Sequence, residues 1–208
     1  MSEILQKDDA IIAEIIAGAR TLFEKFGLKK TTMEDIAKEV GKGKSSLYYY
    51  FPSKYEIFEA VVDQETTELF SQAQIAIDRA TTAKEKLKAY STIRLCKINK
   101  MGNLSQVVKN DLMDNLSVIM NIKKKHEKTQ FIMVKEIIIM GIESGEFKKV
   151  HSKDIDLLAF LFVAAFRGIA LPMCSSDFSF PDLTKSVDTI VDIMVEGIGN
   201  QKSFVNNN

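Results

Sequence analysis

The chain has 208 residues, of which 46% are hydrophobic and 27% charged, and its formal net charge is zero. These values are ordinary for a globular protein of one or two domains, and they exclude a polycation that coats nucleic acid through its overall charge. No signal-peptide pattern is evident, and Arg167 and Pro172 interrupt the most apolar segment, residues 157–173. Because a spanning helix needs about 20 apolar residues, we expect a cytoplasmic protein without membrane contact.

The N-terminal part of the chain predicts three successive helices. Apolar residues at spacings of three and four form a first helix that stops at Gly27. Thr31 and Thr32 offer hydroxyl caps to a two-turn second helix, which ends at Gly41 because glycine adopts the left-handed conformation of a sharp turn. A third helix covers about 44–50 and cannot continue through Pro52.

The third helix has an unusual outer face. Leu47 and Phe51 share its inner face, and six lysines stand against three acidic residues over 29–54. The opposite face presents hydroxyl-bearing side chains, which are Ser45, Ser46, Tyr48, Tyr49 and Tyr50. Such a surface suits contact with base edges and phosphates, as made by the second helix of a helix-turn-helix. Alternatively, these tyrosines pack against the first helix.

Residues 11–62 resemble the N-terminal domain of the TetR (TetR/AcrR-like) family of bacterial transcriptional regulators. The matching string is Ala19, Leu22-Phe23, Phe26-Gly27, Thr31-Thr32, Asp35-Ile36-Ala37, Val40-Gly41 and Leu47 to Lys54. The resemblance implies base or nearby phosphate contacts by Lys44, Ser45, Ser46, Tyr48 and Tyr49, and backbone contacts by Thr32, Tyr50 and Lys54. Lys42 and Gly43 depart from the family pattern of an apolar residue and a capping serine. We expect Lys42 to add a DNA contact and to steepen the salt dependence of binding.

The remainder of the chain also predicts helices, near residues 84–101, 104–122, 126–144, 154–173 and 181–198. We therefore expect an all-α protein of about nine helices. An N-terminal helix-turn-helix DNA-binding domain over residues 1–53 would precede a larger helical regulatory and dimerisation domain over residues 54–208. The polar run at residues 123–128 is expected to be a solvated helix start.

The helix at residues 157–171 is apolar on nearly all sides, so it must be covered on all sides. One side can pack on its own domain and the other on a second copy, and the resemblance implies a homodimer formed through the last two long helices. The candidate interface residues are Phe160, Ala164, Arg167, Gly168, Leu171, Val187, Ile190, Val191 and Met194. The alternative is a core helix of a monomer.

The resemblance further implies a small-molecule effector bound inside the larger domain. Candidate lining residues are Phe70, Tyr90, Arg94, Met113, Met120, Phe131 and Phe162, and they predict a largely apolar ligand. Methionine and phenylalanine at helical spacing are equally typical of ordinary core. Arg94 pairs either with an anionic ligand or with a carboxylate in a surface ion pair.

These features predict a homodimeric, ligand-responsive repressor that binds a palindromic operator in double-stranded DNA and is released by a small molecule. The alternative is a small-molecule binding or sequestering protein with a degenerate DNA-binding head. His126 and His151 lack neighbours at ligand-like spacing, and neither a phosphate-binding glycine loop nor a nucleophile elbow is present. We therefore expect no enzyme activity, catalytic residue, metal site or cofactor.

Overall fold

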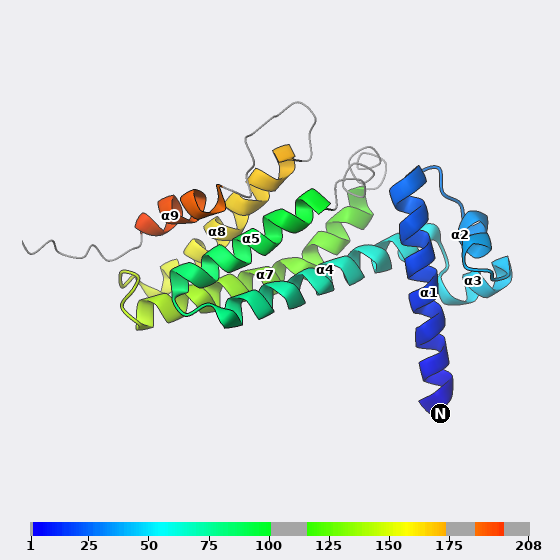
Figure 1. Cartoon of the computed structure of the whole chain (residues 1–208), viewed down its shortest axis with the longest axis horizontal. Helices are drawn as coiled ribbons and strands as arrows, with labels where there is room; N and C mark the ends of the chain where they lie inside the picture. The colour runs from blue at the N-terminus through cyan, green and yellow to red at the C-terminus, as the bar shows by residue number, and fades with distance from the viewer. Residues whose placement is uncertain (1, 101–115, 174–185, 198–208) are drawn as a thin grey trace, which may run out of the picture. The chain divides into compact units, whose positions relative to one another are not determined.

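The computed structural model describes residues 2–100, 116–173 and 186–197, and every regular element in these ranges is a helix (Figure 1). The helices are α1 (Ser2–Phe26), α2 (Met33–Glu39), α3 (Lys44–Tyr50), α4 (Lys54–Arg79), α5 (Ala83–Lys100), α7 (Leu116–Glu143), α8 (Ser152–Met173) and α9 (Val187–Glu196). The predicted all-α fold is confirmed. Most of the expected helix over 104–122 lies outside the described residues.

The chain divides into two compact units. Unit 1 takes in Met1–Glu68 and Lys100–His126, and unit 2 takes in Leu69–Asn99 and Glu127–Asn208. Helices α4 and α7 contribute residues to both units. The predicted boundary after residue 53, between a DNA-binding and a regulatory domain, is a functional division and stays a prediction.

Unit 1 is built on one apolar cluster shared by α1, α2, α3 and the first half of α4. Its fully buried side chains include Ile15, Ala19, Phe23, Ile36, Leu47, Ile57 and Phe58. Helix α1 also approaches the end of α2 closely, because a Cβ added to Gly18 would lie 2.5 Å from Val40 Cγ1. On its other side, Arg20 pairs with the buried carboxylate of Glu65 at 2.6 Å. Apolar packing and the Arg20–Glu65 ion pair therefore both help to hold α1 in place.

Unit 2 has a second apolar core, to which α4, α5, α7, α8 and α9 contribute. Figure 1 shows α4, α5 and α7 running side by side through this unit. The N-terminus of α5 is capped by Glu146, whose carboxylate accepts from the N–H groups of Ala83 at 2.7 Å and Lys84 at 2.9 Å. Helix α9 is tied to α5 by Lys88, which lies 3.0 Å from the carboxylate of Asp192.

The structure corrects the prediction for residues 123–128. They lie inside the continuous helix α7, where the sequence analysis ends one helix and starts another. No glycine or proline interrupts this run, so polarity alone does not break the helix. Lys125 bonds to Asp63, and His126 Nε2 lies 2.7 Å from the same carboxylate. The run is therefore not a helix start and it contacts α4 in unit 1, although Lys124, Lys125 and Lys128 are exposed as the prediction of a solvated run requires.

In the described ranges, none of the helices combines the length and the apolar character that crossing a bilayer would require.

We predict that Asp63→Asn lowers the free energy of unfolding by roughly 0.5–1 kcal/mol at neutral pH. Burial raises the pKa of Asp63, but the hydrogen bonds from Lys125 and His126 outweigh it and hold the pKa below its usual value. Because a lowered pKa stabilises the fold above the unfolded-state pKa, this contribution is lost as pH falls through the folded-state pKa. Urea denaturation at several pH values should show the two proteins converging in acid. A difference that is independent of pH would contradict the assignment.

Candidate functional site

A capping box starts helix α2. The Oγ1 atom of Thr32 accepts from the N–H group of Asp35 at 3.2 Å, and the Thr32 N–H donates to Asp35 Oδ2 at 2.9 Å. The Thr32 hydroxyl also donates to the same carboxylate oxygen, at 2.6 Å. These bonds, the hydroxyl bond first and the backbone bond second, lower the pKa of Asp35. Of the two predicted hydroxyl caps, Thr32 is confirmed, whereas the Thr31 hydroxyl donates to Gly27 O at 2.7 Å and does not cap α2.

The turn between α2 and α3 depends on one glycine. Gly41 has a φ of 62°, and its N–H donates to Lys38 O at 3.2 Å while the N–H of Lys42 donates to Ala37 O at 2.9 Å. This pair of bonds is the Schellman motif, which requires a left-handed residue after the helix cap. A Cβ added to Gly41 would meet no atom within 4 Å. The backbone conformation, and not a lack of space, therefore calls for glycine.

Helix α3 presents its hydroxyl-bearing face to solvent. Its N-cap, Gly43, supplies no side-chain hydrogen bond, as the sequence predicts. Leu47 is 0% exposed and anchors the helix in the core of unit 1, whereas Tyr49 is 77% exposed. Ser45 and Ser46 are also exposed. The predicted division of this helix into an inner and an outer face is confirmed, and its contacts with DNA stay a prediction.

The three tyrosines of α3 have different surroundings. Tyr48 is exposed like Tyr49, but Tyr50 is half-buried and its hydroxyl donates to Oδ1 of Asp8 in α1 at 2.9 Å. This bond raises the pKa of the Tyr50 hydroxyl. The edge of one ring meets the face of the other in the Tyr49–Tyr50 pair, with centroids 4.9 Å apart. Of the three tyrosines, Tyr50 is therefore the one shown to contact the first helix. Tyr50 in turn supports the exposed ring of Tyr49.

Lys54 holds the connection between α1 and α2. Its ammonium donates to three backbone carbonyls, those of Leu28 at 2.8 Å, Lys29 at 3.2 Å and Thr31 at 2.9 Å. An ammonium has three N–H donors, so a phosphate at Lys54 would have to replace one of these bonds. The resemblance places Lys54 on the DNA backbone, and the structure adds a role within the fold that its sequence position does not indicate.

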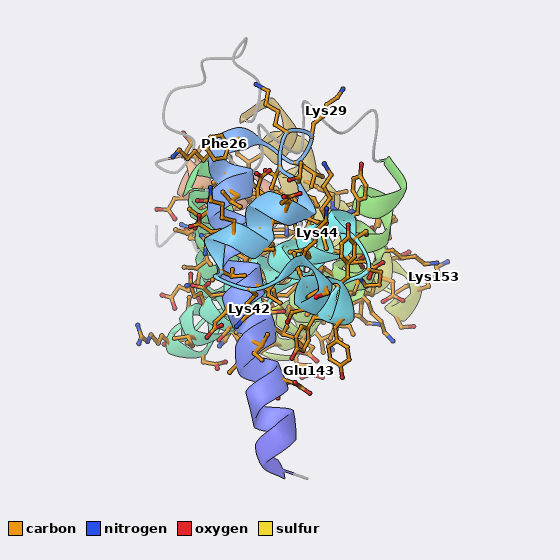
Figure 2. The ribbon with its side chains drawn as sticks, turned by 90° about the vertical axis from the view of Figure 1, so that its right-hand side faces the viewer. Phe26, Lys29, Lys42, Lys44, Glu143 and Lys153 are labelled. Atoms are coloured by element: carbon orange, nitrogen blue, oxygen red, sulfur yellow. The ribbon has the colours of Figure 1, made fainter. Side chains whose placement is uncertain are left out.

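Two lysines flank the start of α3. Lys42 is half-buried and lies 2.8 Å from the carboxylate of Glu14 in α1, while the exposed Lys44 lies 3.4 Å from Glu34. Figure 2 shows Lys42 beside α1 and Lys29 extending away from the connection between α1 and α2. The carboxylate partner is exposed in both pairs, and ion pairs of this kind contribute little to stability.

The candidate effector residues fall into three groups, of which the first two lie in unit 2. Tyr90 and Phe162 are buried in the apolar core, and Phe70 and Phe131 are half-buried against it. Arg94 is buried too, and its Nη1 donates to Oε1 of Gln130 in α7 at 2.5 Å, which contradicts the surface ion pair considered above. Met113 and the side chain of Met120 lie outside the described residues. Gln130 was missed, because a glutamine in a helix carries no distinctive sequence signal.

The candidate interface residues separate into exposed and buried members. Phe160 and Gly168 are exposed, Ala164 is half-buried, and the side chain of Leu171 lies outside the described residues. The remaining members contact unit 2 itself, since Val187 and Val191 are buried in its core, Ile190 and Met194 pack on that core, and Arg167 pairs with Glu127. The sequence analysis missed Leu157, Leu161 and Ile193, which are large apolar side chains exposed on α8 and α9.

No group of three or more His, Cys, Asp or Glu side chains that could hold a metal ion occurs in the part of the chain that the structure describes.

A short exposed helix, α3, which follows α2 through a glycine turn and packs on the apolar cluster of unit 1, defines a helix-turn-helix DNA-binding protein. The family model for bacterial regulatory proteins of the tetR family matches residues 15–61. Over 147 residues, the chain is 31% identical to the HTH-type transcriptional repressor KstR2 of Mycolicibacterium smegmatis, covering 70% of each chain. The chain therefore belongs to the TetR family of bacterial transcriptional regulators.

Solved structures share this fold over nearly the whole chain. A transcriptional regulator from Cytophaga hutchinsonii is 30% identical, with a TM-score of 0.71 over 89% of this chain and 97% of that one. The regulator FadR from Bacillus subtilis, in complex with stearoyl-CoA, has a TM-score of 0.73 at 23% identity, over 89% of this chain and 98% of that one. This second likeness concerns the fold alone.

We predict that Thr32→Ala lowers the free energy of unfolding by about 1 kcal/mol, because α2 loses its capping hydroxyl. Thr32→Ser keeps the hydroxyl and is the matched control, for which we expect nearly full stability. Chemical denaturation of the two variants and the parent checks this. Equal losses in both variants would show that the methyl group of Thr32, and not its hydroxyl, stabilises the helix.

Proposed function

We propose that this protein is a homodimeric repressor that binds a palindromic operator through α3 and releases it when a small molecule binds in unit 2. The observation that carries the DNA-binding part is the exposed hydroxyl-bearing face of α3, centred on Tyr49 and held by the buried Leu47. Hydroxyl groups reach base edges and phosphates, and small serines let the helix sit deep in the major groove. Tyr50 and its hydrogen bond to Asp8 hold the neighbouring ring in position.

An exposed apolar stripe on α8 supports the homodimer. Leu157, Phe160, Leu161, Ala164 and Gly168 follow spacings of three and four, so they lie on one helix face. Phe160 is 54% exposed, and Leu157 and Leu161 are exposed to a similar degree. A contiguous apolar stripe of this kind is typical of a protein interface. In a dimer, two α3 helices would read half-sites separated by about 34–36 Å, one turn of DNA.

A second candidate function has a specific observation in its favour. The ion pair between Lys42 and Glu14 occupies one of the positive charges that would otherwise face phosphate, and Gly43 leaves α3 without a side-chain cap. Both features fit a small-molecule binding protein whose DNA-binding head has degenerated. The variants below separate this function from the repressor.

We predict that Tyr49→Ala weakens operator binding at least tenfold, equivalent to about 1.4 kcal/mol, and leaves the free energy of unfolding within about 0.5 kcal/mol of the parent. The reason is that Tyr49 is largely exposed and its loss leaves no cavity. Fluorescence polarisation with duplex DNA from upstream of the protein's own gene, at several salt concentrations, measures the change. Tyr55→Ala, at an exposed tyrosine outside α3, is the control.

Unchanged binding in Tyr49→Ala, or affinity that does not depend on duplex sequence, would favour the degenerate-head alternative. A salt dependence that falls by about one unit in Lys42→Ala would show that Lys42 exchanges Glu14 for a phosphate.

We predict that Phe160→Glu converts the dimer to a monomer, because a charge placed in an apolar interface costs several kcal/mol. Light scattering coupled to size-exclusion chromatography gives the mass of the parent and the variant. Ile75→Glu, at an exposed apolar residue of α4 away from the stripe, is the matched control and should remain dimeric. A parent protein that is already monomeric at micromolar concentration would refute the homodimer.

A further inference from the structure

We propose that unit 2 holds a binding site for an organic monocarboxylate whose charge pairs with the buried guanidinium of Arg94. This proposal specifies the chemical class of the effector, and it rests on the proposed function for the claim that the ligand regulates operator binding. Arg94 lies on α5 and is only 9% exposed. In the described part of unit 2, it is the one buried side chain that carries a charge.

The hydrogen bonds of Arg94 leave one buried donor of its guanidinium unused in the described residues. Nη1 donates to Oε1 of Gln130 at 2.5 Å and to the hydroxyl of Tyr90 at 3.5 Å. Both acceptors are neutral, and no carboxylate in the described residues pairs with Arg94. The buried Nε–H has no hydrogen-bond partner within those residues. The Nε–H is therefore a buried donor that lacks an acceptor among the described residues.

The charges around Tyr90 favour a ligand with one negative charge. Arg167 of α8 lies near the Tyr90 hydroxyl, but the carboxylate of Glu127 lies 2.8 Å from it and neutralises it. Burial raises the pKa of Tyr90, and the positive charges of Arg94 and Arg167 only partly oppose this rise. With Arg167 paired, the charge of Arg94 has no opposite charge beside it among the described residues, and a monoanion would balance it.

A purely structural role accounts poorly for Arg94. An unpaired buried charge costs several kcal/mol, and an apolar side chain of similar volume would fill the same place at lower cost. A guanidinium edge, in contrast, matches the two oxygens of a carboxylate in a planar, charge-assisted pair. The cluster around this polar group is otherwise apolar, with Leu87, Leu95, Val134 and Phe166 fully buried. We therefore expect the remainder of the ligand to be apolar.

The test uses the full-length protein and a series of straight-chain acids from hexanoate to palmitate, each compared with the alcohol of equal length. Isothermal titration calorimetry without DNA measures binding to the parent, to Arg94→Gln and to Arg79→Gln. We expect at least one acid to bind the parent tenfold or more tightly than its alcohol. Arg94→Gln should abolish that preference and leave alcohol binding unchanged. Arg79 is an exposed arginine of the same unit, so its variant should behave like the parent.

Two further measurements separate ligand binding from a structural role. Without ligand, Arg94→Gln should melt at the same temperature as the parent or higher, because an unpaired buried charge is removed. Arg94→Lys keeps the charge but lacks the planar edge, and it should lose most of the acid preference. The proposal is overturned if no acid in the series shows an Arg94-dependent preference, or if the preference survives in both variants.

The proposed function can fail independently of this site. Acid binding through Arg94 that leaves operator affinity unchanged would confirm the site and refute ligand-induced release. Operator release by the alcohols, equal in the parent and in Arg94→Gln, would support regulation and refute the carboxylate site.

Discussion

The exposed, hydroxyl-bearing face of α3 depends on the packing of one buried side chain, Leu47. Helix α3 has seven residues, too few to be stable by itself. Its position therefore comes from packing of this side chain in the cluster that contains Phe23, Ile36 and Phe58. Because only one fully buried side chain is needed for anchoring, the rest of the helix is available for serine and tyrosine. The same packing that gives stability thus leaves Tyr49 facing outward.

The two units differ in how a buried charged side chain is partnered. In unit 1 the buried carboxylate of Glu65 has a direct ionic partner in Arg20, which is how a buried charge is normally tolerated. In the described part of unit 2, the hydrogen bonds of the buried Arg94 guanidinium go to the neutral groups of Gln130 and Tyr90. Stability explains the first arrangement, whereas the second is better explained by a ligand that completes it.

Helix α8 shows how one apolar segment serves two purposes. Its sequence is apolar on nearly every side, which predicts that all of its faces are buried but does not identify the partner of each face. Phe162, Val163 and Phe166 are buried in the core of unit 2, and Phe160 and its neighbours on the stripe remain exposed. The proposed dimer would cover this second face. Two sets of apolar residues that alternate along one helix can therefore have different partners.

The sequence alone determined the helical class, the stop at Gly27, a threonine cap at residue 31 or 32, the turn at Gly41 and the extent of α3. Each of these depends on backbone conformation and on partners within a few residues, which local sequence specifies. Only the tertiary structure decided that Lys54 bonds to loop carbonyls, that the polar run of α7 contacts α4, and that Val187 faces its own core. Those outcomes join residues far apart in the chain. Many distant partners are chemically equivalent, and packing of the whole unit selects among them.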